Sequence, residues 1–393
     1  MIRPITIATI FGTRPEAIKL FPVIHALQVD SRFDCRVCVT GQHRDLLDSV
    51  LAFADIVPDY DLDVMRPDQS LDALTASLLT DIGTMLDRDR PDWVIVQGDT
   101  TSAFCGALAA YYRKIPIAHV EAGLRSGDNT SPWPEEGNRK IIAAIAALHF
   151  APTQSAAIAL RSESIASDTI HVTGNTAIDA LYEASDRLHS STIYGALEDA
   201  WKSYVDRKII GVTCHRRENF GPGLALIADA IGRIAEREDV AIIFPLHPNP
   251  NVRRVMEERL DGLDNVVLLD PLDYPQFVHL LQKCTFMLTD SGGVQEEAPA
   301  FGKPVLVMRD TTERPEGLAA GTSKLVGTDP AIIVSACHRL LDDPFEYRAM
   351  AKAHSPFGDG KAAARIVEVL ANAGIAKAAD TPSAASYPRP ILE

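Results

Sequence analysis

The chain has 393 residues, of which 46% are hydrophobic and 23% are charged, and its formal net charge is −15 at pH 7. This length allows two domains with separate cores, and the acidic balance argues against a general nucleic-acid-binding protein, because phosphate backbones attract basic surfaces. The chain opens with a strand pattern instead of a signal peptide, and it has neither a membrane-spanning apolar run nor a disulfide framework. We therefore expect a cytoplasmic protein that does not bind membranes.

The N-terminal part alternates apolar strands with amphipathic helices. The first helix follows Gly12, where Thr13 can cap it and Glu16 stands three residues later, as in a capping box. This alternation predicts a parallel sheet with helices on both faces. The predicted strands are 5–11, 35–40, 93–96, 117–120 and 170–172, and further helices are predicted at 42–53, 71–86 and 103–112.

Residues 177–206 interrupt this alternation with a charged, helical connector that has few core-like positions. Strand patterns resume at 208–213, 241–244, 266–269, 286–289 and 304–308, with helical segments between them. We predict an α/β fold with two Rossmann-like parallel-sheet domains that face each other across a cleft. The expected parts are a first domain at 1–176, a second at 207–360, a terminal helix at 361–372 that packs back on the first domain, and a mobile tail at 373–393.

Polar residues recur where the predicted strands end, and ligands bind at the carboxyl ends of strands in open parallel sheets. No G-x-G-x-x-G follows the first strand, and the sequence contains no P-loop and no zinc-binding motif. We therefore expect neither a bound dinucleotide nor a metal. The residues at predicted strand ends are Arg14, Asp99, Glu121, His215, His247, Ser291 and Arg314.

The stretch 290–298 marks a turn from a buried strand into a helix. Gly292 and Gly293 would let the backbone turn sharply and let a ligand approach closely, and a helix N-terminus suits phosphate. Glu296 and Glu297 are expected in the first helical turn, where a carboxylate can instead bind sugar hydroxyls. The simpler alternative is a Gly-Gly turn with acidic residues that favour the helix dipole.

Several carboxylates are candidates for proton transfer. Asp99 and Glu121 follow apolar strands, whereas Glu135 and Glu136 lie in a segment that we expect to be too rich in proline to form a regular element. A single carboxylate at a strand end is often a helix cap or the partner of an arginine. Three around one cleft could instead hold different protonation states and divide acid and base roles.

Two segments supply positive charge. His215 is followed by two arginines, so an anionic oxygen could bind there and receive a proton from the imidazole, although an isolated histidine is more often structural. Arg314 could clamp a diphosphate, and an ion pair with Glu313 or Glu316 is equally possible.

Several short motifs follow one another along the chain: F-G-T-R-P-E-A-I-K at 11–19, G-D-T-T at 98–101, H-V-E-A-G-L-R at 119–125, S-P-W-P-E-E at 131–136, H-R-R-E at 215–218, S-G-G at 291–293, and the segment 309–316. Together they resemble the non-hydrolysing UDP-N-acetylglucosamine 2-epimerases over nearly the whole chain. The resemblance implies a GT-B-like fold, with the sugar and the catalytic carboxylates on the N-terminal domain and UDP on the C-terminal one. It also implies a homodimer.

The resemblance further implies roles for single residues. Asp99, Glu121, Glu135 and His215 match catalytic residues, and Glu297 matches a ribose contact. An allosteric site for a second UDP-GlcNAc matches Gln42, Glu136, Arg216 and His247, although Asp45 stands where relatives have glutamine. Contacts with the nucleotide-sugar match Arg14, Lys19, Asp99, Glu121, His215, Leu272, Phe277, Ser291, Gly292, Gly293, Glu297 and Arg314. Leu272 also replaces a glutamine, so only a backbone contact carries over there.

The implied reaction is reversible epimerisation at C2, which interconverts UDP-GlcNAc and UDP-ManNAc. The C2 proton is not acidic, since no carbonyl is adjacent, and the sequence lacks the dinucleotide motif that transient oxidation would need. Elimination of UDP to 2-acetamidoglucal, followed by re-addition, is the remaining route. The alternatives are a hydrolysing epimerase that releases ManNAc and UDP, a GT-B glycosyltransferase that uses UDP-GlcNAc, and a non-catalytic nucleotide-sugar sensor.

Overall fold

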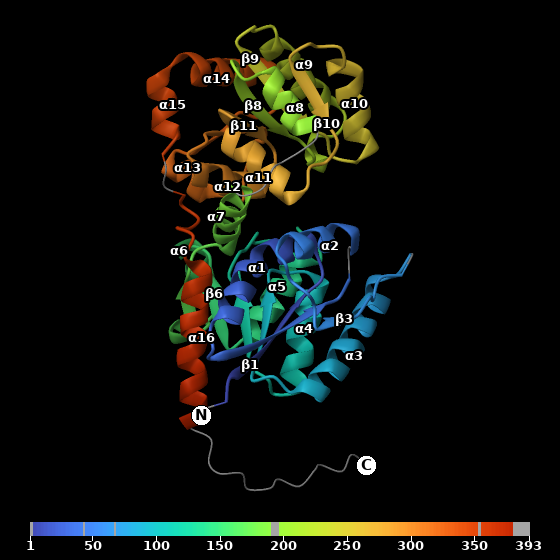
Figure 1. The fold of residues 1–393 in the computed structure, drawn as a ribbon, viewed down its shortest axis with the longest axis vertical. Coiled ribbons are helices and arrows are strands. Elements are labelled where there is room, and N and C mark those ends of the chain that lie inside the picture. Colours follow the sequence, from blue (N-terminus) through green and yellow to red (C-terminus); the bar gives the residue numbers. More distant parts are fainter. Residues whose placement is uncertain (1–2, 42–43, 67, 190–195, 353–354, 380–393) are drawn as a thin grey trace. The chain divides into compact units, whose positions relative to one another are not determined.

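The computed structural model of this chain describes residues 3–41, 44–66, 68–189, 196–352 and 355–379 (Figure 1). The contacts divide the chain into two compact units. Unit 1 comprises the described residues up to Leu47, Ile56–Thr173 and those from Lys361 onward, and unit 2 comprises Asp48–Asp55 and Gly174–Gly360. Each unit is built around one parallel sheet, which confirms the predicted class of two parallel-sheet α/β domains.

The sheet of unit 1 has the strand order β3-β2-β1-β4-β5-β6-β7. Strands β4 and β5 are buried along their whole length, which is why they appear in the sequence as continuous apolar runs. The order reverses between β1 and β4, and in open sheets this reversal creates the crevice in which ligands bind. The strands are β1 (Ile5–Phe11), β2 (Phe33–Val39), β3 (Tyr60–Asp61), β4 (Trp93–Gln97), β5 (Ile117–Val120), β6 (Leu148–Ala151) and β7 (Ile170–Val172).

The helices of unit 1 form two packed groups, α3 with α4 and α5, and α1 with α16. The last helix was predicted to end at residue 372 but continues to Ala379, so residues 373–379 are helical. Residues 380–393 lie outside the described residues. The helices are α1 (Arg14–Val29), α2 (Arg44–Phe53, grouped with unit 2 from Asp48 onward), α3 (Leu71–Asp89), α4 (Thr101–Tyr112), α5 (Glu135–Ile145), α6 (Gln154–Ser162), η1 (Ser167–Thr169) and α16 (Ala362–Ala379).

The sheet of unit 2 has the strand order β10-β9-β8-β11-β12-β13, which repeats the pattern of unit 1. Its reversal lies between β8 and β11, whose last residues, Thr213 and Thr289, are paired in register. The residues that follow these two strands therefore emerge side by side. The strands are β8 (Lys208–Thr213), β9 (Val240–Pro245), β10 (Val266–Leu269), β11 (Phe286–Thr289), β12 (Val305–Val307) and β13 (Ser323–Leu325).

The helices of unit 2 also pack in two groups, α9 with α10 and α14, and α7 with α11 and α12. The predicted connector contains α7 and α8, and both belong to unit 2. Its scarcity of core positions was overstated, because Ile178, Leu181 and Ala184 of α7 are completely buried. The helices are α7 (Thr176–His189), α8 (Ala196–Ser203), η2 (Arg217–Asn219), α9 (Pro222–Ala235), α10 (Pro250–Leu260), α11 (Tyr274–Lys283), α12 (Gly292–Glu297), η3 (Ala298–Phe301), α13 (Pro315–Ala320), α14 (Pro330–Asp342) and α15 (Pro344–Met350).

The segment around Glu135 and Glu136 corrects one expectation. These residues form the first turn of α5 and not an irregular loop. Pro132 and Pro134 precede the helix and so do not interrupt its hydrogen bonds, and a proline is well tolerated where a helix begins. Strands β3, β6 and β13 were not predicted, because runs of two to four residues carry little periodic signal. Among the described helices, none combines the length and apolar character that a membrane span needs.

Candidate active site

Asp99 and Glu121 follow the neighbouring strands β4 and β5 of unit 1, as predicted. Glu121 is buried and adopts a left-handed backbone conformation with φ +63°, which is uncommon for any residue but glycine and is frequent at functional sites. Its Oε1 lies 2.5 Å from Lys19 Nζ, and its Oε2 accepts a hydrogen bond from Gln97. The structure therefore brings together two of the predicted substrate contacts, Lys19 and Glu121.

Asp99 has a different cationic partner, Arg139 of α5. Arg139 donates to Asp99 Oδ2 through Nη2 and through Nε at 3.1 Å. Burial raises the pKa of Asp99; Arg139 opposes that shift, and the nearby charge of Glu121 adds to it. Asp99 thus holds a proton more readily than an exposed aspartate does, although both carboxylates are paired with a cation, Asp99 with the Arg139 guanidinium and Glu121 with the Lys19 ammonium. A difference in surroundings lets two carboxylates divide acid and base work.

Arg139 was not predicted as a site residue, although its spacing from Glu136 could have indicated that the two side chains interact. It lies three residues after Glu136 on α5, so the two side chains share one helix face, and Arg139 Nη1 is 3.2 Å from Glu136 Oε2. Glu136 is completely buried and also accepts the backbone N–H of Ser126 at 3.1 Å. Each of the two glutamates also has one enclosed oxygen, Oε2 of Glu135 and Oε1 of Glu136, without a hydrogen-bond partner among the described residues.

The turn that carries Asp99 is held from two directions. His119 Nε2 lies 2.8 Å from the carbonyl oxygen of Gly98, and Asn138 Nδ2 donates to the carbonyl oxygen of Asp99 at 2.9 Å. Burial lowers the pKa of His119 to about 3, so its ring is neutral at physiological pH. Gly98 itself has φ +68°, a conformation that glycine adopts without steric cost. His119 and Asn138 therefore support the catalytic candidate without being candidates themselves.

Glu16 links the loop that carries Arg14 to the loop that carries Asp99. Arg14 begins α1 and is half-buried. Glu16 is fully buried and accepts from Gly12 N at 3.1 Å, Thr13 N at 2.9 Å, Thr13 Oγ1 at 2.8 Å and Thr100 Oγ1 at 2.7 Å. The predicted capping box is thus present and extends to the loop after β4. Burial raises the pKa of Glu16 to about 7, although all these hydrogen bonds act in the opposite direction.

This burial predicts a pH dependence of stability. The pKa of Glu16 rises from 4.5 to about 7 on folding, so the folded protein binds an extra proton between these values, and its stability falls as the pH rises through them. The effect is on the order of 1–3 kcal/mol. We expect the Tm of Glu16→Gln to change less than that of the wild type between about pH 5 and pH 8. Thermal unfolding of both proteins, with exposed Glu368→Gln as control, measures this, and parallel curves for wild type and Glu16→Gln would contradict it.

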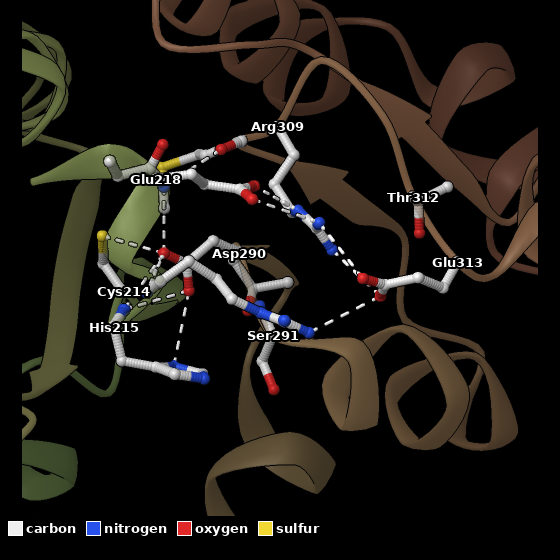
Figure 2. Close-up of polar contacts among 12 residues, drawn as sticks. Cys214, His215, Glu218, Asp290, Ser291, Arg309, Thr312 and Glu313 are labelled. Carbon is white, nitrogen blue, oxygen red and sulfur yellow. Dashed lines mark hydrogen bonds and ion pairs between the residues drawn. The ribbon is translucent and has the colours of Figure 1, made fainter. Parts of the chain in front are cut away.

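In unit 2, a buried carboxylate organises the loop after β8. Asp290 follows β11 and is completely buried. It accepts the backbone N–H of His215 at 3.0 Å, the backbone N–H of Arg216 at 2.9 Å and the side-chain amide of Asn219 at 3.0 Å (Figure 2). From the sequence, Asp290 belonged to the turn at 290–298 but had no assigned role. Its role becomes visible in the structure, because β11 and β8 end at the same level and Asp290 therefore lies beside the loop that follows β8.

The imidazole of His215 lies between Asp290 and His247. His215 Nδ1 is 3.4 Å from Asp290 Oδ1, and the ring stacks on that of His247 with centroids 5.6 Å apart and an interplanar angle of 20°. Burial lowers the pKa of His215, and the charge of Asp290 opposes this. Two residues predicted for different sites, His215 and His247, are therefore in direct contact.

Arg309, which follows β12, ties two loops together (Figure 2). Its nearly buried guanidinium places Nε 2.5 Å from Glu218 Oε1 and Nη1 3.2 Å from Glu313 Oε2. Arg216 Nη2 lies 3.6 Å from the same Glu313 oxygen. Arg309 thus links the loop that carries Glu218 to the segment that leads to Arg314.

Arg314 has a partner that was not considered from the sequence. It donates through Nε to Glu296 Oε1, and Glu296 Oε2 accepts from Asn175 Nδ2 at 2.7 Å. Glu313, one of the two predicted alternatives, is paired with Arg309. The expectation that Glu296 and Glu297 lie in the first turn of their helix was wrong, because α12 begins at Gly292 and ends at Glu297.

The Ser291 turn also differs from its prediction. Ser291 has φ −80° and ψ 135°, and neither Gly292 nor Gly293 has a positive φ. The turn therefore does not need the conformational freedom of glycine. A Cβ at Gly292 would lie 3.5 Å from Arg216 Nη2, and one at Gly293 would lie 4.0 Å from Ser291 Oγ, which are ordinary contacts. Close approach by a ligand, the other reason given for these glycines, stays a prediction.

The other predicted residues lie on unit 2 or outside the described chain. Leu272 lies between β10 and α11, Phe277 lies on α11, and Glu297 ends α12; all three are half-buried. Gln42 and the side chain of Asp45 lie outside the described residues. Within the described part of the chain, no group of three His, Cys, Asp or Glu side chains is arranged to hold a metal ion.

The fold and the two strand-end clusters define a two-domain α/β enzyme of the GT-B type, with Asp99 and Glu121 at strand ends of one sheet and His215, Arg216 and Asp290 at the switch point of the other. Residues 25–371 match the family described as UDP-N-acetylglucosamine 2-epimerase. The chain is 50% identical to the UDP-N-acetylglucosamine 2-epimerase of Escherichia coli K12 over 369 residues, which cover 93% of this chain and 98% of that protein. It belongs to the UDP-N-acetylglucosamine 2-epimerase family, whose members are isomerases.

Solved structures agree with this assignment. The UDP-GlcNAc 2-epimerase of Neisseria meningitidis bound to UDP-GlcNAc has a TM-score of 0.86 and 46% identity, and the match covers 93% of this chain and 100% of that one. The Staphylococcus aureus MnaA–UDP structure has a TM-score of 0.84 and 45% identity, with 97% and 100% coverage. The glycosyltransferase SnogD of Streptomyces nogalater, at 16% identity, 94% and 100% coverage and a TM-score of 0.60, shows the shared fold alone.

Proposed function

We propose that the chain interconverts UDP-GlcNAc and UDP-ManNAc by inverting C2 without net hydrolysis. The observation that carries this proposal is the contrast between Asp99 and Glu121, which follow neighbouring strands and have different cationic partners. A single glycosyl transfer does not require two such carboxylates beside the sugar. Inversion at C2 does, because one group removes a proton from one face and another returns a proton to the opposite face.

The proposed reaction has two steps. A base takes the C2 proton, the C1–O bond breaks, and its electron pair leaves with UDP, so that a C1–C2 double bond forms in 2-acetamidoglucal. An acid then protonates C2 on the other face while a UDP oxygen adds back to C1. No redox change occurs, and all the atoms of the substrate are conserved.

We assign the first proton transfer, in the direction from UDP-GlcNAc, to Glu121. The Lys19 ammonium 2.5 Å from its Oε1 favours the carboxylate form, which a base needs. We assign the opposite-face proton to Asp99, because the raised pKa of this residue helps it retain one. Glu135, with one carboxylate oxygen unpartnered among the described groups, is the third proton-transfer group and relays protons between the sugar and water.

In unit 2 we propose the site for UDP. Gly292 and Gly293 offer backbone donors and Ser291 its hydroxyl to the diphosphate, Glu297 binds the ribose, and Phe277 and the backbone of Leu272 contact the nucleotide-sugar. Arg314 clamps the diphosphate. In unit 1, Arg14 is proposed as a further contact with the nucleotide-sugar. His215 gives its proton to the diphosphate oxygen that leaves C1, which lowers the barrier to C1–O cleavage. Both structures of relatives named above contain ligands of this class, UDP-GlcNAc and UDP.

Turnover of UDP-GlcNAc in D₂O tests the proposal. We expect deuterium at C2 of both recovered nucleotide-sugars, since the abstracted proton exchanges with solvent before re-addition. Free ManNAc with UDP would instead identify a hydrolysing enzyme. Transfer to an acceptor without C2 deuterium would identify a glycosyltransferase, and binding without turnover a sensor. Mass spectrometry and proton NMR of the recovered sugars separate these outcomes.

We further propose a homodimer in the cytoplasm and allosteric activation by a second UDP-GlcNAc, bound by Gln42, Glu136, Arg216 and His247. Light scattering at twice the 42.7 kDa chain mass would support the dimer. In the same turnover assay, UDP-ManNAc alone should react slowly until a trace of UDP-GlcNAc is added. An immediate full rate would exclude activation of this kind.

A further inference from the structure

The proposed chemistry does not by itself explain why Asp290 lies beside His215. The carboxylate has no exposed surface, and besides the contacts given above it accepts from Cys214 Sγ at 3.3 Å. A buried carboxylate is costly to keep unless its oxygens are satisfied in this way. The hydrogen bonds from the backbone N–H groups of His215 and Arg216 hold the loop after β8 in place, and this explains part of the position of Asp290. They do not account for the contact with the imidazole.

The geometry fixes the acid and the ring relative to each other. The backbone N–H of His215 binds both carboxylate oxygens at 3.0 Å, while Nδ1 of the same residue lies 3.4 Å from Oδ1. The stacked ring of His247 limits rotation on the other side. The imidazole therefore presents Nδ1 to Asp290 and turns Nε2, on the opposite edge of the ring, away from it (Figure 2).

We propose that Asp290 is the positioning residue for His215: it holds the proton of the neutral imidazole on Nδ1, leaves Nε2 for the diphosphate oxygen, and stabilises the imidazolium when Nε2 is protonated. A carboxylate behind an imidazole has this role in the triads of serine hydrolases. Here the proton on Nε2 passes to the departing UDP oxygen and returns from it when UDP adds back. This inference rests on the proposed role of His215 in UDP departure.

The charge of Asp290 favours the protonated form of His215 against the other influences on the ring. Burial is the largest influence and lowers the pKa of the ring, and the positive charges of Arg216, His247 and Arg309 act in the same direction. Of these influences, the charge of Asp290 is the one that favours the imidazolium. Loss of its charge therefore lowers the pKa of His215, and the protonated form disappears at a lower pH.

Asp290→Asn tests the inference, because it removes the charge and nearly keeps the shape. We expect kcat to fall by roughly 10²-fold, since an amide can donate to Nδ1 and so favour the wrong tautomer, while KM changes by less than about threefold. The high-pH limb of the kcat profile should move to lower pH by roughly one unit or more, as expected for loss of an opposite charge at this distance. An unmoved limb would overturn the proposal.

Asn219→Ala is the matched control, because it removes a neutral donor to the same carboxylate. It should lower the Tm and leave the high-pH limb in place; a limb that moves as far as in Asp290→Asn would show a purely structural effect and overturn the proposal.

If Asp290→Asn does not fold, ¹⁵N NMR of the wild-type histidines, assigned with His215→Gln, reports the tautomer. We expect the proton on Nδ1, and a proton on Nε2 would overturn the inference. This readout needs no turnover, so its failure is separate from a failure of the epimerase proposal, which the D₂O experiment tests.

Discussion

The Glu121→Gln variant is expected to lose epimerisation and C2 hydrogen exchange together, with kcat falling by roughly 10²- to 10⁴-fold. Glutamine keeps the shape of the side chain and its contact with Gln97, but it cannot accept the C2 proton. The ion pair with Lys19 is also lost, so KM should rise in addition. Initial rates and deuterium incorporation from UDP-GlcNAc in D₂O measure both effects.

The Asp99→Asn variant is expected to separate hydrogen exchange at C2 from epimerisation. If Asp99 supplies the opposite-face proton, this variant should still exchange hydrogen at C2, because Glu121 remains to remove and return it, while inversion becomes slow. The ratio of exchange to epimerisation therefore rises in Asp99→Asn and not in Glu121→Gln. The reverse result would interchange the two assignments. Glu368→Gln, an exposed glutamate on α16, should behave as the wild type.

The second large effect is expected at His215. His215→Ala should lower kcat by roughly 10²-fold or more while KM rises only a few-fold, because proton donation to the departing oxygen acts in the transition state. The ring is half-exposed and stacks on only one neighbouring ring among the described contacts, so the variant should remain folded. Steady-state kinetics from UDP-GlcNAc provide the measurement.

The control for His215→Ala is His338→Ala, on α14 of the same unit and outside the site. It should retain wild-type kinetics. An effect of His215→Ala on KM alone would make His215 a binding residue. The expected effect of Asp290→Asn on turnover would then disappear as well, since Asp290 acts through the imidazole.

Much of the fold could be predicted because its signals are local. Buried parallel strands are short continuous apolar runs, and helices repeat their apolar residues every three or four positions. The residues Asp99, Glu121, His215 and Ser291 follow such strands within two residues, as predicted. Errors arose where a local signal was weak or misread, as at α5, where prolines that precede a helix were taken as evidence against one.

The contacts of the candidate site could not be predicted in the same way. Lys19 and Glu121 are 102 positions apart in the chain, and Asp290 and His215 are 75 apart. Asp290 and His215 meet because β8 and β11 are neighbours in a sheet and end at the same level. Lys19 instead reaches Glu121 from α1, the helix that follows β1, and β4 separates β1 from β5 in the sheet. For Arg314 the sequence offered adjacent glutamates, and the structure adds a distant partner, Glu296, which lies on α12.

The sequence by itself determined the two parallel-sheet units, the strand ends that carry polar residues, and, through its ordered motifs, the family. The tertiary structure alone decided which charges are paired, which are buried, and therefore in which direction the pKa of a buried carboxyl such as Asp99 is shifted. The physical reason is that apolar periodicity depends only on residues that are close together in the sequence. A pKa, in contrast, depends on solvent exclusion and on charges brought within a few ångströms by strand order and register.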